Sequence, residues 1–182
     1  MFGKHRPSQR SVNAGVSLET PDMLTFCRWL EQTSVGAGVR ESLWLFPTIE
    51  TMHLLGMAAL VGTTAVFDFR LLGWAMRRER VSELAGRLLP WSWAGFAVQA
   101  VTGALLFTSE AVKAYTNPAF RVKMLLIFLA GVHALIFHWT VYRDVATWDD
   151  SGVLPTGAKV AGFVSILLWV GIVAAGRFIG FV

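Results

Sequence analysis

The sequence predicts an all-α integral membrane protein, a four-helix bundle preceded by an N-terminal amphipathic interfacial helix. Composition is the first reason: 54% of the 182 residues are hydrophobic and only 15% are charged, whereas a soluble domain carries about 25% charged residues. Four apolar segments are the second, since each is long enough to cross a bilayer core that needs about 20 apolar residues. Proline placement is the third, because a proline stands at or near the start of each segment, where a helix tolerates its missing N–H.

Those prolines set the predicted spans. They are Pro47, Pro90, Pro118 and Pro155, and the spans are about 47–73, 90–110, 118–143 and 155–180. Between the first two spans, the charged stretch "RRERVSELAGR" predicts a helical extension outside lipid. Small residues in the second and fourth spans, such as Gly95 and Gly162, allow close approach of helix backbones. Together, the spans predict one compact bundle over residues 41–182.

The N-terminal segments have a different character. Residues 1–20 are basic, carry no signal-peptide pattern and are predicted to be a disordered tail. Residues 21–40 predict the amphipathic helix, with Thr20 or Asp22 as its cap and Gly36 to Gly38 as its end. Its apolar face consists of Met23, Phe26, Trp29 and Leu30. We expect this helix to lie in the plane of the lipid headgroups.

The distribution of basic residues bears on partners and orientation. With four spans, both chain ends lie on one side, here side A, and the opposite side is side B. The net charge of +4 comes from bases that flank apolar spans, which fits anionic lipid headgroups and not nucleic acid. The positive-inside rule favours side B as the cytoplasmic side. The single Cys27 excludes an internal disulfide and a cysteine metal cluster within one chain.

The ionisable residues of the spans fall into two layers. Such residues are costly in lipid and normally face the bundle interior or a water-filled cavity. The layer near side A consists of Glu50, His53, Arg121, Lys123 and Arg177, with Glu110 at the same level. The layer near side B consists of Asp68, Arg70 and His138. Glu50 and His53 are three residues apart and share a helix face, so they can act together on a ligand or instead pair with Arg177 or Lys123.

The histidines raise the question of a metal or haem b. His53 and His138 are the candidate ligands. From the helical rise, these two residues differ in depth by roughly 20 Å, and His53 and His133 differ by about 12 Å. One haem does not comfortably take either pair, which leaves a haem with one histidine, two haems across a homodimer, or histidines with structural roles. A di-iron bundle needs a second Glu-x-x-His pair, and the sequence has none.

Several motifs resemble a known group of proteins. They include "LFPTIETMH", "FDFRLLG", "NPAFRVK" and "GRFIG". With these motifs the chain, from Trp29 to its end, resembles an uncharacterised bacterial family of four-helix membrane proteins, a domain of unknown function. A more distant likeness is to the copper-resistance D domain and the membrane protoporphyrinogen oxidase. The family resemblance implies a multi-pass protein of the bacterial plasma membrane. The more distant likeness suggests, by analogy only, a role related to redox chemistry, haem or metal.

We therefore expect a small membrane protein that binds haem b or a quinone-like ligand. Glu50 and His53 would form its site, with Arg121, Lys123 and Arg177 beside them. The rival hypothesis is a non-enzymatic accessory subunit, bound to a membrane partner subunit, or a small permease. In that hypothesis the polar layers hold helices together or line a pathway.

Overall fold

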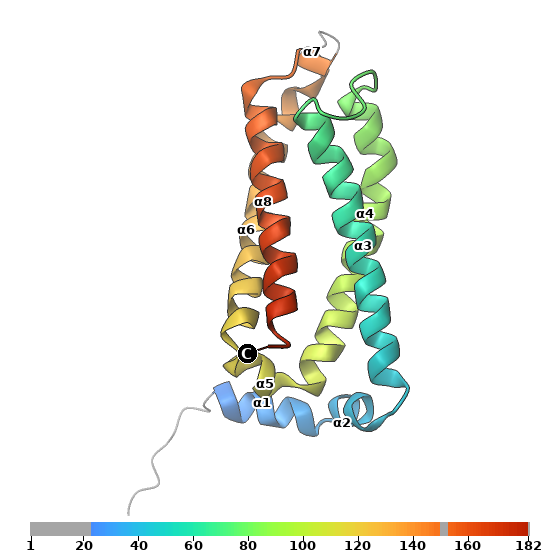
Figure 1. Cartoon of the computed structure of the whole chain (residues 1–182), viewed down its shortest axis with the longest axis vertical. Coiled ribbons are helices and arrows are strands. Elements are labelled where there is room, and N and C mark those ends of the chain that lie inside the picture. Colours follow the sequence, from blue (N-terminus) through green and yellow to red (C-terminus); the bar gives the residue numbers. More distant parts are fainter. Residues whose placement is uncertain (1–22, 150–152, 182) are drawn as a thin grey trace, which may run out of the picture.

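The computed structural model describes residues 23–149 and 153–181, and over these residues the protein is all-α. Its long helices are α3 (Leu45–Leu71), α4 (Val81–Ser109), α6 (Pro118–Thr140) and α8 (Thr156–Phe178). The shorter elements are α1 (Met23–Gln32), α2 (Ser34–Glu41), α5 (Ala111–Thr116), the 3₁₀ turn η1 (Tyr142–Asp144) and α7 (Val145–Asp149). The long helices stand side by side, with α1 and α2 lying across one end and α7 at the other (Figure 1).

Three helices in the described ranges are long and apolar enough to cross a membrane: Leu45–Leu71, Pro118–Asp149 and Thr156–Phe178. Their outward faces are apolar, and large side chains such as Leu55, Phe128 and Val170 are exposed. A soluble protein would bury so much apolar surface. The chain therefore has the properties of an integral membrane protein.

The helix limits correct the sequence prediction at two points. Helix α4 begins at Val81 and not at Pro90, which lies inside it. Its first turns, residues 81–87, are the second part of the charged stretch that was expected to be helical, whereas residues 77–80 lie in the loop before α4. An internal proline lacks the N–H of one helical hydrogen bond and crowds the carbonyl four residues earlier, which here is that of Gly86.

The predicted amphipathic helix is two helices in the structure. Thr33 breaks it and caps α2, because its side-chain oxygen accepts a hydrogen bond from the Gly36 N–H at 3.2 Å. The expected end at Gly36 to Gly38 is therefore wrong, since both glycines lie within α2. Gly36 is needed there because a Cβ would sit 2.8 Å from the carbonyl oxygen of Thr108 in α4. The proposed caps Thr20 and Asp22, and the tail 1–20, lie outside the described residues.

The long helices form two pairs, α3 with α4 and α6 with α8, and the pairs meet through α3 and α8. The α3–α4 crossing is close, since a Cβ on Gly95 would lie 2.9 Å from the backbone nitrogen of Leu60. A buried cluster of Leu71, Val81 and Ala158 joins the pairs at the side B end. The pairs are thus held together mainly at side B, and Figure 1 shows them separating toward side A.

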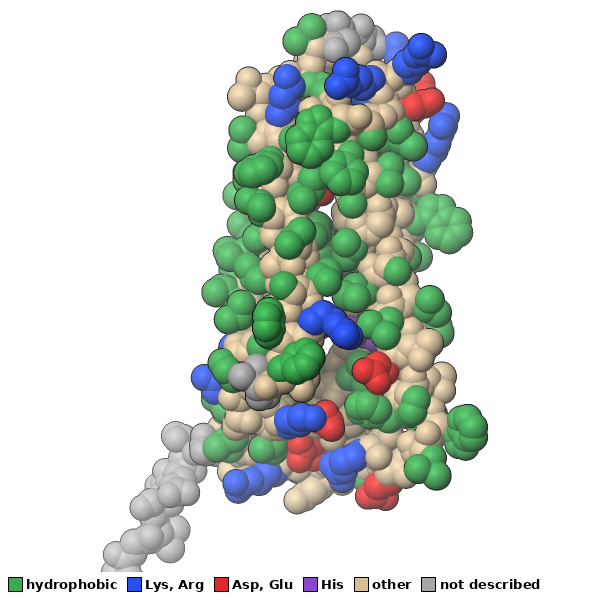
Figure 2. Space-filling model, in the orientation of Figure 1, with side chains coloured by type: hydrophobic (Ala, Val, Ile, Leu, Met, Phe, Trp, Pro, Cys, Tyr) green, Lys and Arg blue, Asp and Glu red, His purple; other side chains and the backbone are tan. Residues whose placement is uncertain are grey.

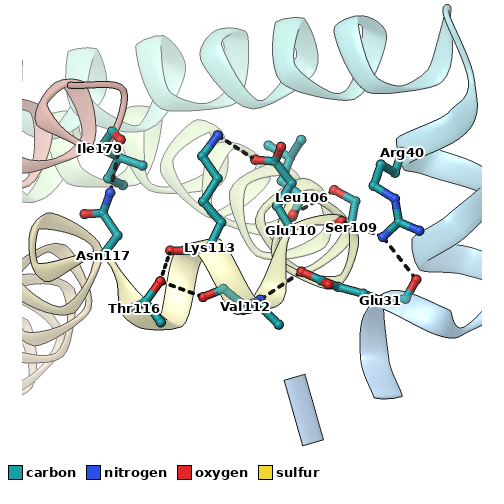
Figure 3. Close-up of polar contacts among 10 residues, drawn as sticks. All are labelled: Glu31, Arg40, Leu106, Ser109, Glu110, Val112, Lys113, Thr116, Asn117 and Ile179. Atoms are coloured by element: carbon teal, nitrogen blue, oxygen red, sulfur yellow. Dashed lines mark hydrogen bonds and ion pairs between the residues drawn. The ribbon is translucent and has the colours of Figure 1, made fainter. Parts of the chain in front are cut away.

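Polar bonds tie the short helices to the bundle at side A (Figure 3). The Glu31 carboxylate of α1 accepts a hydrogen bond from the Val112 N–H, at the start of α5. The Arg40 guanidinium of α2 donates to the carbonyl of Ser109, the last residue of α4. The Asn117 side chain caps α6 and also donates to the Ile179 carbonyl beyond α8. Side A is therefore bordered by a connected rim that includes all of these elements.

Candidate functional site

His53 is the best-defined member of the side A layer. Its Nδ1 atom lies 2.8 Å from the Thr102 hydroxyl oxygen of α4. Its ring packs onto Gly103, where an added Cβ would lie 3.3 Å from Cε1. The Gln99 side chain donates a hydrogen bond to the His53 backbone carbonyl. Three residues spaced along one face of α4 thus fix both the backbone and the ring of His53.

The Thr102 hydroxyl determines which nitrogen of His53 carries the proton. A hydroxyl has one proton, and Thr102 donates it to the Val98 carbonyl of its own helix. Thr102 therefore accepts a hydrogen bond from Nδ1–H of His53. In the neutral imidazole, the lone pair is then on Nε2. This nitrogen bonds to no described residue. Every fully buried polar side-chain atom of the described residues has a partner. Because Nε2 has none, it is not fully buried and is open to a ligand.

Lys123 approaches the same site from α6. Its chain passes over Gly176 of α8, where Nζ lies 3.7 Å from the position that a Cβ would occupy. The absence of a side chain at Gly176 leaves room for this path. The Lys123 charge acts on the His53 ring, so the two groups lie near each other between the helix pairs. Lys123 is half-buried, and its ammonium makes no bond to a described residue.

We call the surface between the helix pairs at His53 and Lys123 the seam. Figure 2 shows a basic side chain lying across it, with a histidine ring, an acidic side chain and a hollow beside it. Glu50, one turn before His53, is exposed, and no ion pair joins it to a described residue. The expected alternative in which Glu50 pairs with Lys123 or Arg177 is thus not formed in this part of the chain.

The other predicted residues of the side A layer lie apart from the seam site. Arg121 donates to the Tyr115 carbonyl and stacks over the Tyr115 ring, 5.0 Å from its centroid. Glu110 pairs with Lys113 at 3.5 Å. Arg177 is exposed at the end of α8. Of the predicted side A residues, the structure therefore brings Lys123 near His53 and leaves Glu50 and Arg177 as exposed charges near the same end.

The side B layer is also divided. Asp68 is 5% exposed and accepts a hydrogen bond of 2.6 Å from the Ser165 hydroxyl, which links α3 to α8. Arg70 is buried, but its Nε donates to the Glu79 carbonyl in the loop before α4. His138 is exposed and stacks on Tyr142. His138 therefore does not join Asp68 and Arg70 in a shared site.

The two candidate metal ligands, His53 and His138, do not lie together. The structure places His53 and His138 toward opposite ends of the long helices, and the described ranges hold no group of three or more His, Cys, Asp or Glu side chains fit for a metal. His133 is occupied elsewhere, because its Nε2 lies 3.0 Å from the Ala161 carbonyl of α8. His53, His133 and His138 thus have separate environments, and no second imidazole from the described residues faces His53.

Sequence comparison gives the family. Residues 26–182 match a family described as a family of unknown function, DUF6644. The chain belongs to the DUF6644 family. This confirms the resemblance to a domain of unknown function seen in the motifs. No curated protein and no solved structure matches this DUF6644 member.

Two site residues were not expected from the sequence. Thr102 and Gln99 stand out only as polar residues in an apolar span, and sequence reasoning assigned neither to His53. The available signal was their spacing, since residues three apart share one helix face. The pairing of helices was needed to show that this face meets His53.

Proposed function

We propose that this chain is a small four-span membrane protein that binds a quinone-like ligand in the seam. The observation that carries the proposal is the open Nε2 of His53 beside the Lys123 ammonium, neither of which bonds to a described residue. A lone pair on Nε2 accepts a hydrogen bond from a hydroxyl, and an ammonium donates one to a ring oxygen. A hydroquinone offers both kinds of group on a flat apolar ring. The seam between apolar helices is also reached from the lipid in which such ligands dissolve.

Helix α4 is the fourth span in this proposal, although its composition is less apolar than that of the others. It carries Gln99, Thr102 and Ser92, all of which bond to α3 or to α4 itself. Polar side chains paired with a neighbouring helix are tolerated inside a membrane. The polarity of α4 is therefore directed at α3, and its length of 29 residues is more than enough to cross.

Haem b fits the described residues less well. Bis-histidine ligation needs a second imidazole facing His53, and His133 and His138 face other partners. A haem held by His53 alone is the form that the geometry still permits. Its optical spectrum separates it at once from a quinone.

The rival role, in which polar residues hold helices together, is favoured at side B by one contact. The buried Asp68–Ser165 hydrogen bond connects α3 and α8 where Gly162 lets the helices approach. This contact supports a structural role for Asp68. It does not account for the open groups in the seam.

Binding of decylubiquinone to the protein in nanodiscs tests the proposal. The matched variants are His53→Ala, Lys123→Met and, as the control, His138→Ala, which makes the same change as His53→Ala away from the seam. We expect the first two to weaken binding by roughly tenfold or more, since each removes a direct polar contact. The His138→Ala variant should bind as the wild type does. A Soret band lost in His53→Ala, or equal binding by all variants, would contradict the quinone assignment.

A further inference from the structure

A second candidate site lies at the side B end, in the loop between α3 and α4. A cavity there is lined by Met76, Arg77, Arg78, Glu79, Leu84 and Arg87. We propose that this cavity, the arginine pocket, binds the phosphate of an anionic phospholipid headgroup. The proposal is independent of the seam site, which lies toward the other end of the long helices.

The loop is held in place by a buried residue. Arg70 is 7% exposed, and its Nε donates to the Glu79 carbonyl at 2.8 Å. The Glu79 N–H in turn donates to the Met76 carbonyl, and Met76 adopts a left-handed backbone conformation with φ of 49°. Arg77 and Arg78 therefore project from a fixed turn, which reduces the entropy lost when they bind a ligand.

Two of the three guanidinium groups have no carboxylate partner among the described residues. Arg87 pairs with Glu79 at 3.6 Å and with Glu83 at 4.0 Å. Arg77 donates through Nε to the Gly73 carbonyl, which leaves its terminal nitrogens for another acceptor. Arg78 bonds to no described residue. Guanidinium groups bind phosphate oxygens in pairs of parallel hydrogen bonds, so this pocket suits a phosphate.

The depth of the pocket identifies the source of the phosphate as lipid. The candidate span ends at Leu71, and the pocket begins five residues later at Met76. Trp74 and Trp91 are exposed on the same end, and tryptophans gather at the membrane–water boundary. The half-exposed Met76 adds an apolar wall. Figure 2 shows basic side chains gathered at this end of the molecule.

The test measures lipid binding to the purified full chain by native mass spectrometry, with phosphatidylglycerol and phosphatidylcholine as probes. The Arg77→Gln/Arg78→Gln variant removes the two unpaired guanidinium groups. Its matched control is Arg143→Gln/Lys159→Gln, which removes the same charge from exposed residues at the same end. The single Arg78→Gln variant is a second probe that disturbs no described contact.

We expect the wild type to prefer phosphatidylglycerol to phosphatidylcholine. In the pocket variant the ratio of the two affinities should fall by roughly tenfold to thirtyfold, the effect expected for two basic residues near an anionic surface. Arg78→Gln should lose part of this preference, and the control should keep it. Equal loss in the control would mean that only the total charge matters and would overturn the site. Displacement of the lipid by millimolar inorganic phosphate would assign the pocket to a soluble phosphate and overturn the lipid assignment.

Discussion

His53 shows how one ring can be both fixed and available. Its Nδ1 side faces Thr102 and Gly103 of α4, whereas Nε2 bonds to no described residue. A partner on one nitrogen sets the tautomer and orientation of an imidazole and so prepares the other nitrogen for a ligand. The same arrangement serves a metal ligand or a proton acceptor. The nearby Lys123 charge, with no carboxylate of the described ranges at bonding distance, favours a ligand that carries its own oxygen acceptors.

Thr102 is therefore predicted to act as a positioning residue for His53. In Thr102→Val the hydroxyl is lost with little change of shape, so the Nδ1–H loses its acceptor. Affinity for decylubiquinone should fall by roughly threefold to tenfold, the value of one hydrogen bond of about 1 kcal/mol. Nitrogen-15 spectra of histidine-labelled protein should show the proton leaving Nδ1, which a merely structural effect would not produce.

The control for this prediction is Thr108→Val on the same helix. The Thr108 hydroxyl donates only to the Ala104 carbonyl of α4, so this variant should leave both affinity and spectrum unchanged. Thr102→Ser keeps the hydroxyl and should restore both. An unchanged spectrum in Thr102→Val would show that Thr102 does not set the tautomer.

At the scale of elements, the sequence predicted what depends on local chemistry. Asn117 and Pro118 start α6, and Pro155 precedes α8, as proline and cap preferences require. The predicted span began at Pro90, because proline is favoured in the first turn of a helix, whereas α4 begins at Val81 and continues through Pro90. In the candidate site, the sequence analysis placed His53 and Lys123 in one polar layer by their depth along the spans, whereas the Thr102 contact depends on which helices are neighbours, and one sequence does not specify that.

The α3–α4 crossing gives a prediction about stability. A methyl group in Gly95→Ala would meet the Leu60 backbone nitrogen at 2.9 Å and the Gly56 carbonyl oxygen at 3.1 Å. Backbone atoms cannot rotate away, so the helices must separate. We expect a loss of about 1–3 kcal/mol in unfolding free energy, typical of overpacking, measured by denaturation in detergent.

Gly62→Ala on α3 is the matched control, since nothing lies within 4 Å of the added Cβ. This variant should be neutral or gain up to about 1 kcal/mol, because alanine favours a helix more than glycine does. Equal effects of the two substitutions would show that the α3–α4 pair does not cross as closely as the structure has it.

At the scale of the whole molecule, the helix count across the membrane decides where the sites face. With α4 as a span, both ends of the bundle lie on one side, and the seam site and the arginine pocket open toward opposite surfaces. The bonds at side A support this arrangement, since Arg40 of α2 reaches Ser109 at the end of α4 and Glu31 of α1 binds the Val112 N–H at the start of α5. With only three spans, Ser109 and Val112 would lie across the bilayer from α1 and α2.

Cysteine labelling of intact spheroplasts tests the count. In a Cys27→Ser background, which removes the buried native thiol, single cysteines replace Glu41, Phe181 and Arg143, all exposed. Because four crossings return the chain to its starting side, Glu41→Cys and Phe181→Cys should react alike with a membrane-impermeant maleimide, and Arg143→Cys in the opposite way. If Glu41→Cys and Phe181→Cys label from opposite sides, α4 does not cross. In that case α4 would lie outside the lipid, and its polar residues would not be expected to pair with His53 of α3.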